Sequence, residues 1–139
     1  MLICDTSGLL ARYDPDEVSH KATRTALAGA SPPFVLSPLV LAELDHLLRA
    51  RHRLDAVRAV LDDLVSRGFE HPHLDATALR SCLDVDKRYA DLNLGMTDAS
   101  LVVLAARYRT RDILTLDHRH FRAVVPRQGG SFRLLPTDC

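Results

Sequence analysis

Short apolar runs alternate with helix-forming segments along the whole chain. A helix that crosses over a sheet returns the chain to the same edge, so strands separated by helices are expected to pair in parallel. The pattern therefore predicts an α/β sandwich around a small parallel sheet. The predicted strands are the apolar runs at residues 2–4, 34–36, 113–116 and 132–135.

The helices between these runs are predicted from apolar spacing and from capping residues. The clearest helical pattern covers residues 54–65, whose apolar positions fall on one face, and Gly68 is expected to end this helix in the left-handed conformation. Ser37 is suited to cap a helix over residues 39–51, which comes before the helix over 54–65, and Pro38 can occupy its first turn. Together these two helices carry more apolar surface than one small sheet needs, which indicates a second subunit or a protein partner.

Two further helices are expected in the second half of the chain. Asp75 can cap a helix whose apolar positions include Leu79 and Leu83. Thr97 can cap another over residues 98–107, and the lack of a polar face predicts that this helix is largely buried.

Length and composition restrict the class of protein. The chain has 139 residues, 47% of them hydrophobic and 26% charged, which fits a single domain spanning residues 1–139. No apolar run reaches the roughly 18 residues that cross a bilayer, and the first residues carry Asp5 in place of the basic start of a signal peptide. The three cysteines include no Cys-x-x-Cys pair. These features favour a cytoplasmic protein without a disulfide framework, a zinc clip or a membrane association.

Four acidic residues occupy apolar surroundings. Asp5 and Asp117 each end an apolar strand, so both are expected in the crevice at the carboxyl ends of the strands. Glu43 lies on or beside the apolar face of its helix, and Asp98 lies in the first turn of a buried helix, where the dipole favours a negative charge. Taken singly, each has an ordinary explanation as a turn residue, a rim charge or a helix-start acid. The prediction of a site therefore depends on the set of four.

A shared pocket for these carboxylates requires a positive partner. Two carboxylates about 4 Å apart repel by about 4 kcal/mol at an effective dielectric constant near 20. Oxygen ligands with open positions suit Mg²⁺ or Mn²⁺, which keep waters and bind phosphates. Such a centre is suited to phosphoryl chemistry with a cation-activated water.

Four segments of the chain resemble the acidic signatures of the PIN-domain ribonucleases: residues 2–7, 41–44, 94–100 and 113–117. The size of the chain is most similar to the VapC toxins of prokaryotic toxin–antitoxin pairs. The resemblance implies a three-layer α/β/α fold with a central parallel sheet and a Mg²⁺- or Mn²⁺-dependent endoribonuclease that cleaves structured RNA, either tRNA or rRNA. It also implies inhibition by a VapB-like antitoxin and assembly as a homodimer.

The resemblance assigns the catalytic and metal positions to four residues: Asp5, Glu43, Asp98 and Asp117. It implies direct metal contact for Asp5 and Asp98, whereas Glu43 would hold metal-bound water or a second ion. Asp117 matches the fourth acid, which varies more within the family.

Other polar residues near these acids have less definite roles. Ser7 and Thr115 match hydroxyl positions that could orient a carboxylate, or they are simply turn and strand-end hydroxyls. The histidine pairs in segments 71–73 and 118–120 lack zinc-site spacing and are expected in surface loops. His118 and His120 follow Asp117 closely enough to contact a bound phosphate, but the general base is left unassigned.

Two other function classes compete with the nuclease. The first is a non-catalytic RNA-binding or regulatory module with the same fold, and the presence of all four acids argues against it. The second is a Mg²⁺-dependent phosphatase acting on small molecules, whose usual Asp-x-Asp pair is absent because Ser7 stands two residues after Asp5.

Overall fold

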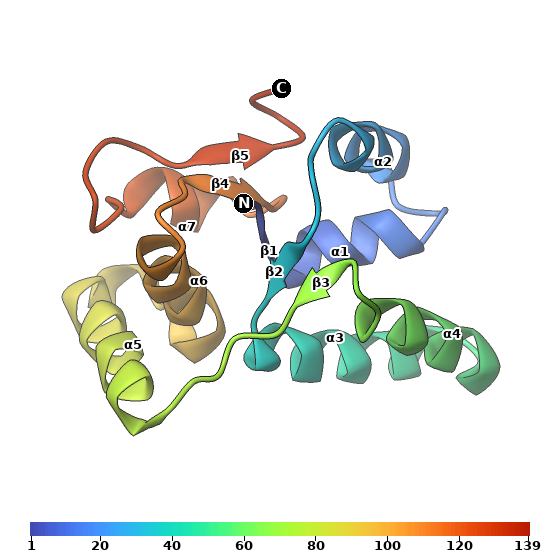
Figure 1. Cartoon of the computed structure of the whole chain (residues 1–139), viewed down its shortest axis with the longest axis horizontal. Coiled ribbons are helices and arrows are strands. Elements are labelled where there is room, and N and C mark those ends of the chain that lie inside the picture. Colours follow the sequence, from blue (N-terminus) through green and yellow to red (C-terminus); the bar gives the residue numbers. More distant parts are fainter.

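Five short strands form one fully parallel sheet at the centre of the computed structural model, which describes all 139 residues (Figure 1). The strand order across the sheet is β3-β2-β1-β4-β5. The buried strands consist almost entirely of apolar residues, as expected for a parallel sheet covered on both faces. The strands are β1 (Ile3–Cys4), β2 (Phe34–Leu36), β3 (Phe69–Glu70), β4 (Asp112–Leu114) and β5 (Arg133–Leu135).

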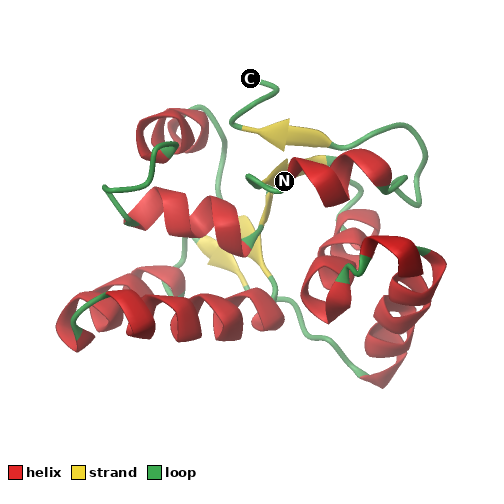
Figure 2. Ribbon diagram, turned by 180° about the vertical axis from the view of Figure 1, so that it is seen from behind, coloured by secondary structure: helices red, strands yellow, loops and turns green.

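Helices cover the sheet from both sides. Helices α5, α6 and α7 gather on one side, and α1, α2, α3 and α4 gather on the other (Figures 1 and 2). This arrangement confirms the three-layer α/β/α fold. The helices are α1 (Thr6–Tyr13), α2 (His20–Ala28), α3 (Pro38–Arg51), α4 (Leu54–Leu64), α5 (Ala76–Arg88), α6 (Gly95–Arg107) and α7 (His118–Ala123), with a short 3-10 turn at Ala90–Leu92. No helix combines the length and the apolar character needed to span a membrane.

The order of the strands creates a switch point between β1 and β4. From β1 the chain builds outward through β2 to β3, and it then returns to place β4 and β5 on the other side of β1. Ile3 is paired with Val35 of β2 on one side and with Ile113 of β4 on the other. Ligands of open α/β sheets bind in the crevice at the carboxyl ends of the strands beside such a switch point. The ends of β1 and β4 therefore define where a site is expected.

Close contact between α1 and β4 depends on Gly8. A Cβ atom at this position would lie 2.6 Å from the backbone oxygen of Leu114, a distance that real Cβ atoms do not show. The backbone N–H of Asp5 donates to the same Leu114 oxygen at 3.0 Å. The first turn of α1 is thus held directly against the end of β4.

A chain of hydrogen bonds links the N-terminal ends of α3 and α6. The N–H of Leu39 donates to Ser37 Oγ at 3.3 Å, which caps α3, and Ser37 Oγ lies 2.8 Å from Ser100 Oγ. The hydroxyl of Ser100 in turn donates to the carbonyl oxygen of Thr97 at 2.6 Å. Both serines are fully buried. The link fixes the position of α3 relative to α6.

Strand β3 and helix α2, like helix α7, lie outside the predicted pattern. Strand β3 consists of two residues at the edge of the sheet, where the Phe69 ring packs edge-on against Phe34 with centroids 5.9 Å apart. Helix α2 buries only Thr23, Ala26 and Leu27. Neither segment has enough apolar positions to show a period in the sequence.

Several helix details differ from the predictions. Helix α4 ends at Leu64, and Gly68 is not in the left-handed conformation. Helix α6 begins at Gly95, whose φ of 77° suits glycine, instead of after a Thr97 cap.

Helix α5 is capped by Asp75 as predicted, because Oδ1 of Asp75 accepts a hydrogen bond from the N–H of Ala78 at 2.8 Å. Leu79 and Leu83 are exposed, and α5 instead turns Ala78, Cys82 and Val85 inward. The inward residues are smaller, and small residues allow helix α5 to pack closely against α6.

Candidate functional site

Asp5 lies at the end of β1 and is almost completely buried, with 4% of its surface exposed. Its carboxylate caps α1, because Oδ1 accepts a hydrogen bond from the N–H of Thr6 at 2.7 Å. Its Oδ2 accepts hydrogen bonds from two hydroxyl groups, Ser7 Oγ at 2.6 Å and Thr115 Oγ1 at 2.7 Å. Three donors therefore fix the orientation of this carboxylate.

The two hydroxyl donors are themselves oriented by the backbone after β4. The N–H of Leu116 donates to Ser7 Oγ at 2.9 Å, and the N–H of Asp117 donates to Thr115 Oγ1 at 2.9 Å. Since each hydroxyl oxygen accepts from an amide, its own proton is free to point at Asp5. The expectation that Ser7 and Thr115 orient a carboxylate is confirmed in geometry.

The pKa of Asp5 is raised above its usual value, chiefly because burial disfavours the charged form. The three hydrogen bonds oppose this effect, and the negative charge of Glu43 adds to it. Asp5 is therefore a carboxylate whose charge is poorly hydrated and repelled by a neighbour. A cation in its vicinity would relieve both effects.

Asp98 projects from the first turn of α6. Burial is the largest cause that raises its pKa to about 6, and the charges of Asp5 and Asp117 raise it further. A hydrogen bond from His120 acts in the opposite direction, with Nδ1 of His120 at 2.6 Å from Asp98 Oδ2. The site thus holds a carboxylate that is half protonated near pH 6.

Asp117 caps α7 and shares the same histidine. Its Oδ1 accepts a hydrogen bond from the N–H of His120 at 3.1 Å, and its Oδ2 lies 3.1 Å from Nδ1 of the His120 ring. Asp98, Asp117 and His120 each offer one metal-ligating atom, and these atoms all lie within 4.8 Å of one another. We call this group, together with Asp5 and Glu43, the acidic centre.

Glu43 is the outermost member of the acidic centre. It lies on α3 beside the buried residues Val40 and Leu44, and it is exposed. Its charge acts on Asp5, which in turn acts on Asp98, so the four acids lie within electrostatic reach of one another. The structure therefore brings the four predicted residues to the carboxyl edge of the sheet, with Glu43 at the solvent-facing rim.

His120 was not assigned to the site from the sequence. Segment 118–120 was expected in a surface loop, but it forms the start of α7 and the His120 side chain is only 16% exposed. Helix α7 has six residues and buries only Phe121, so it shows no apolar period. The available signal was local: His120 lies three residues after a helix-capping aspartate.

His118 and His71 have hydrogen-bond partners away from the acidic centre. His118 Nε2 lies 2.9 Å from Thr137 Oγ1, and His71 Nε2 lies 2.9 Å from the backbone oxygen of Leu64. Both of these histidines therefore have partners outside the acidic centre.

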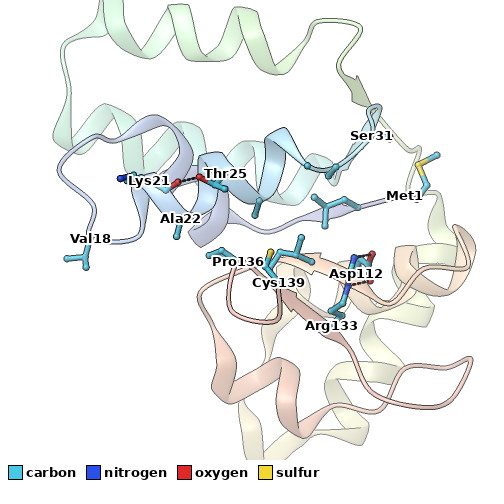
Figure 3. A pocket seen from close by; sticks show the side chains of 15 residues that line it. Met1, Val18, Lys21, Ala22, Thr25, Ser31, Asp112, Arg133, Pro136 and Cys139 are labelled. Carbon is cyan, nitrogen blue, oxygen red and sulfur yellow. Dashed lines mark hydrogen bonds and ion pairs between the residues drawn. The ribbon is translucent and has the colours of Figure 1, made fainter.

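The largest cavity of the molecule lies elsewhere. It has a volume of about 900 Å³ and separates α2 from the C-terminal segment that contains β5 (Figure 3). Small and apolar residues such as Ala22, Ala26 and Leu135 line it, together with an ion pair between Asp112 and Arg133. We call it the α2–β5 cavity.

Fold and site together define an α/β protein with an acidic centre at the switch point of a parallel sheet. The family model of the PIN domain matches residues 2–125, and the chain belongs to the PIN-domain family. Among curated proteins, the chain is 42% identical over 135 residues to ribonuclease VapC26 of Mycobacterium tuberculosis (strain ATCC 25618 / H37Rv), covering 97% of this chain and 100% of that protein. The predicted similarity to VapC-type toxins is confirmed.

Two solved structures share the fold. VapC20 of Mycobacterium tuberculosis, described as a toxin that cleaves the sarcin–ricin loop, matches with a TM-score of 0.79 and 19% identity over 86% of this chain and 92% of that one. A toxin–antitoxin complex from Klebsiella pneumoniae matches with a TM-score of 0.66 and 16% identity over 89% and 92% of the two chains. At these identities the matches support the three-layer architecture.

Proposed function

We propose that the chain is a divalent-metal-dependent endoribonuclease and the toxin of a toxin–antitoxin pair. The observation that carries the proposal is the convergence of Asp5, Glu43, Asp98 and Asp117 at the switch point, with the pKa of Asp98 raised to about 6. A relative that is 42% identical over nearly the whole chain is named a ribonuclease.

The donor set of the acidic centre fits a divalent cation. Carboxylate oxygens are the ligands that Mg²⁺ and Mn²⁺ prefer. The pKa values of Asp5 and Asp98 are raised chiefly by burial and further by neighbouring carboxylates, and a cation beside them would offset both effects. Asp5 and Asp98 are the proposed direct ligands, with Asp117 beside them and Glu43 at the rim. Mg²⁺ or Mn²⁺ is the proposed ion.

The cation, when bound, would supply an activated water and neutralise charge on the phosphate. The protein holds the proposed ligand side chains in fixed orientations. Ser7 and Thr115 hold Asp5 in one orientation, and Asp98 is held by His120. Glu43 is exposed, and its proposed role is to orient a water at the rim of the acidic centre. The phosphodiester of a structured RNA, either tRNA or rRNA, is the proposed substrate.

A chelation experiment tests the proposed activity. Purified chain is incubated with structured RNA in the presence of Mg²⁺, of Mn²⁺, or of either ion with excess EDTA. We expect cleavage with the ions, fragments that carry a 5′-phosphate and a 3′-hydroxyl, and no cleavage with EDTA. RNA that binds but stays intact with both ions would contradict the proposal and favour a non-catalytic RNA-binding module.

The proposed partners are a VapB-like antitoxin and a second copy of the chain. One structural neighbour is a toxin–antitoxin complex. Leu54 and Val65, at the two ends of α4, are 43% and 62% exposed, so part of the apolar surface predicted in this region is free to be covered. Light scattering of the chain, alone and with a candidate VapB-like antitoxin, tests this. A monomer that forms no complex would contradict both assignments.

A further inference from the structure

His120 places an imidazole nitrogen among the carboxylates of the acidic centre. Its Nδ1 lies 2.6 Å from Asp98 Oδ2 and 3.1 Å from Asp117 Oδ2. The side chains of His120 and Asp98 are each 16% exposed, and that of Asp117 is 36% exposed. The nitrogen is therefore within the cluster and not at its surface.

The position of His120 is fixed by the helix that carries it. Asp117 caps α7 by accepting a hydrogen bond from the backbone N–H of His120. One residue further, Phe121 is buried and packs edge-on against Phe132, with ring centroids 6.0 Å apart. The same short helix thus anchors itself in the core and presents the ring to Asp98.

The spacing of the three donor atoms matches that of neighbouring ligands on one ion. Around a six-coordinate cation with bond lengths near 2.1 Å, adjacent ligand atoms lie about 3 Å apart. The nitrogen and each of the two oxygens are separated by 2.6 and 3.1 Å, and all three lie within 4.8 Å. The three atoms are therefore close enough together to act as ligands of one cation.

We propose that Nδ1 of His120 is a ligand of the divalent cation, and that this nitrogen makes the acidic centre select Mn²⁺ over Mg²⁺. The inference rests on the proposed metal-dependent function and deepens it. Mg²⁺ takes oxygen donors and retains its waters, whereas imidazole nitrogen is a ligand typical of transition metals. A centre of carboxylates alone would lack this source of selectivity.

The competing role for His120 is that of a positive partner for Asp98. In that role the positive charge of the ring would repel the cation, and removal of the ring would strengthen the binding of Mg²⁺ and Mn²⁺ alike. The ligand role predicts the reverse, a loss confined mainly to Mn²⁺. A single substitution of His120 therefore distinguishes the two roles, because one predicts a gain in Mn²⁺ affinity and the other a loss.

Electron paramagnetic resonance of bound Mn²⁺ tests the proposal without measuring activity. The full chain is stripped of metal and titrated with Mn²⁺, and Mg²⁺ affinity is measured by competition. Pulsed spectra should contain coupling to a directly bound nitrogen in the wild type and in His118→Ala, the matched control two residues earlier on α7. Labelling histidine with ¹⁵N should change that coupling in both proteins. This comparison does not require a variant at position 120 to fold.

His120→Ala should remove the nitrogen coupling. It should also weaken Mn²⁺ binding by about tenfold or more, because loss of a partner even outside the inner shell of a metal costs about 10- to 100-fold in affinity, whereas Mg²⁺ binding should change far less. Bound Mn²⁺ without nitrogen coupling, or equal changes for both ions, would overturn the inference and leave the proposed function standing. A wild-type chain that binds neither ion would overturn both.

Discussion

The acidic centre and the α2–β5 cavity are two openings with opposite properties. The cavity has a volume of about 900 Å³, and much of its lining is apolar (Figure 3). The acidic centre gathers charge at the switch point, where burial and mutual repulsion raise the pKa values of Asp5 and Asp98. The proposed chemistry is therefore assigned to the acidic centre from the energetic cost of its charges, and not from the volume of a cavity.

The hydrogen bonds around the two openings differ in the same way. At the acidic centre, one amide and two hydroxyls converge on one carboxylate, Asp5, and one of the hydroxyls, that of Thr115, comes from a distant segment. At the cavity, the charged groups Asp112 and Arg133 are satisfied by each other, with contacts of 2.9 and 2.6 Å. Substitutions of the same type at each opening therefore test whether activity resides in one of them alone.

The largest expected effect is that of Asp98→Asn. The substitution keeps the size of the side chain and removes the charge that would hold a cation, so the rate of RNA cleavage should fall by at least about a hundredfold, the scale seen when one stabilising group of a transition state is lost. Asp112→Asn, the same change in the lining of the α2–β5 cavity, should leave the rate unchanged. Gel-based cleavage rates at saturating Mn²⁺ measure both. Equal losses in the two variants would end the distinction between the openings.

Gly8→Ala should impair folding and activity together. The added methyl group would meet backbone oxygen of Leu114 at 2.6 Å, so α1 and β4 must separate, at a cost of about 1–3 kcal/mol. Because Asp5 sits at this junction, cleavage should fall as well.

Gly29→Ala is the matched control for Gly8→Ala. Gly29 lines the α2–β5 cavity, its φ is −85°, and its nearest neighbour would lie 3.6 Å from the new methyl group. Urea denaturation and cleavage rates should show little change in this control. A Gly8→Ala protein with wild-type stability would show that the contact between α1 and β4 is not tight.

Thr115→Val should have a smaller effect, and one that depends on pH. It removes one of two hydroxyl donors to Asp5 and leaves the N–H of Asp117 without its acceptor, which should cost about 1–3 kcal/mol of stability. Loss of a donor to the charged form raises the pKa of Asp5 further, so the acidic limb of the rate profile should move to higher pH.

Thr25→Val is the control for the loss of a threonine hydroxyl in Thr115→Val. Thr25 lines the α2–β5 cavity and donates only to the Lys21 carbonyl of its own helix, at 3.0 Å. Its pH–rate profile should overlay that of the wild type. A profile of Thr115→Val that also overlays the wild type would show that the hydroxyl relay does not control Asp5.

Much of this arrangement could be predicted from the sequence, because it depends on local patterns and on one topological rule. Apolar runs marked four of the five strands, and the carboxyl ends of parallel strands must share an edge, so Asp5 and Asp117 were expected to meet. The edge strand at Phe69–Glu70 and helix α2 were missed, since neither is long or apolar enough to show a period.

The parts that could not be predicted are contacts between distant residues. The Ser37–Ser100 link joins residues 63 positions apart, and Thr115 reaches Asp5 across 110 positions. His120 enters the site because a six-residue helix turns it toward Asp98, whereas His118, two residues earlier, faces Thr137. Which of two neighbouring histidines joins the centre is decided by the packing of α7, and one sequence does not contain that information.

The smallest expected effect is a change in stability. Asp98→Asn should stabilise the folded chain, although it should lower the rate of RNA cleavage. The pKa of Asp98 in the folded chain is about 6, above its value of 3.8 in the unfolded chain, with burial the largest cause. Between about pH 4 and pH 6 the folded state therefore retains a proton that the unfolded state has released, so stability falls as the pH rises through this range. Asp98→Asn removes the ionisable group, and with it this loss of stability. In EDTA its thermal midpoint should match the wild type near pH 4 and exceed it by a few degrees at pH 7.5.

The same measurement with a cation completes the comparison of the two openings. Mn²⁺ binds the folded state and should raise the thermal midpoint of the wild type at pH 7.5, but it should raise that of Asp98→Asn far less. Asp112→Asn, which changes the cavity, should keep both the wild-type decline of stability with pH and the wild-type response to Mn²⁺. If Asp98→Asn and the wild type lost stability in parallel as the pH rose, Asp98 would not be strained by its neighbours. The charge of Asp98 would then carry no energetic cost for a cation to relieve, and the physical argument for a metal would depend on the buried carboxylate of Asp5 alone.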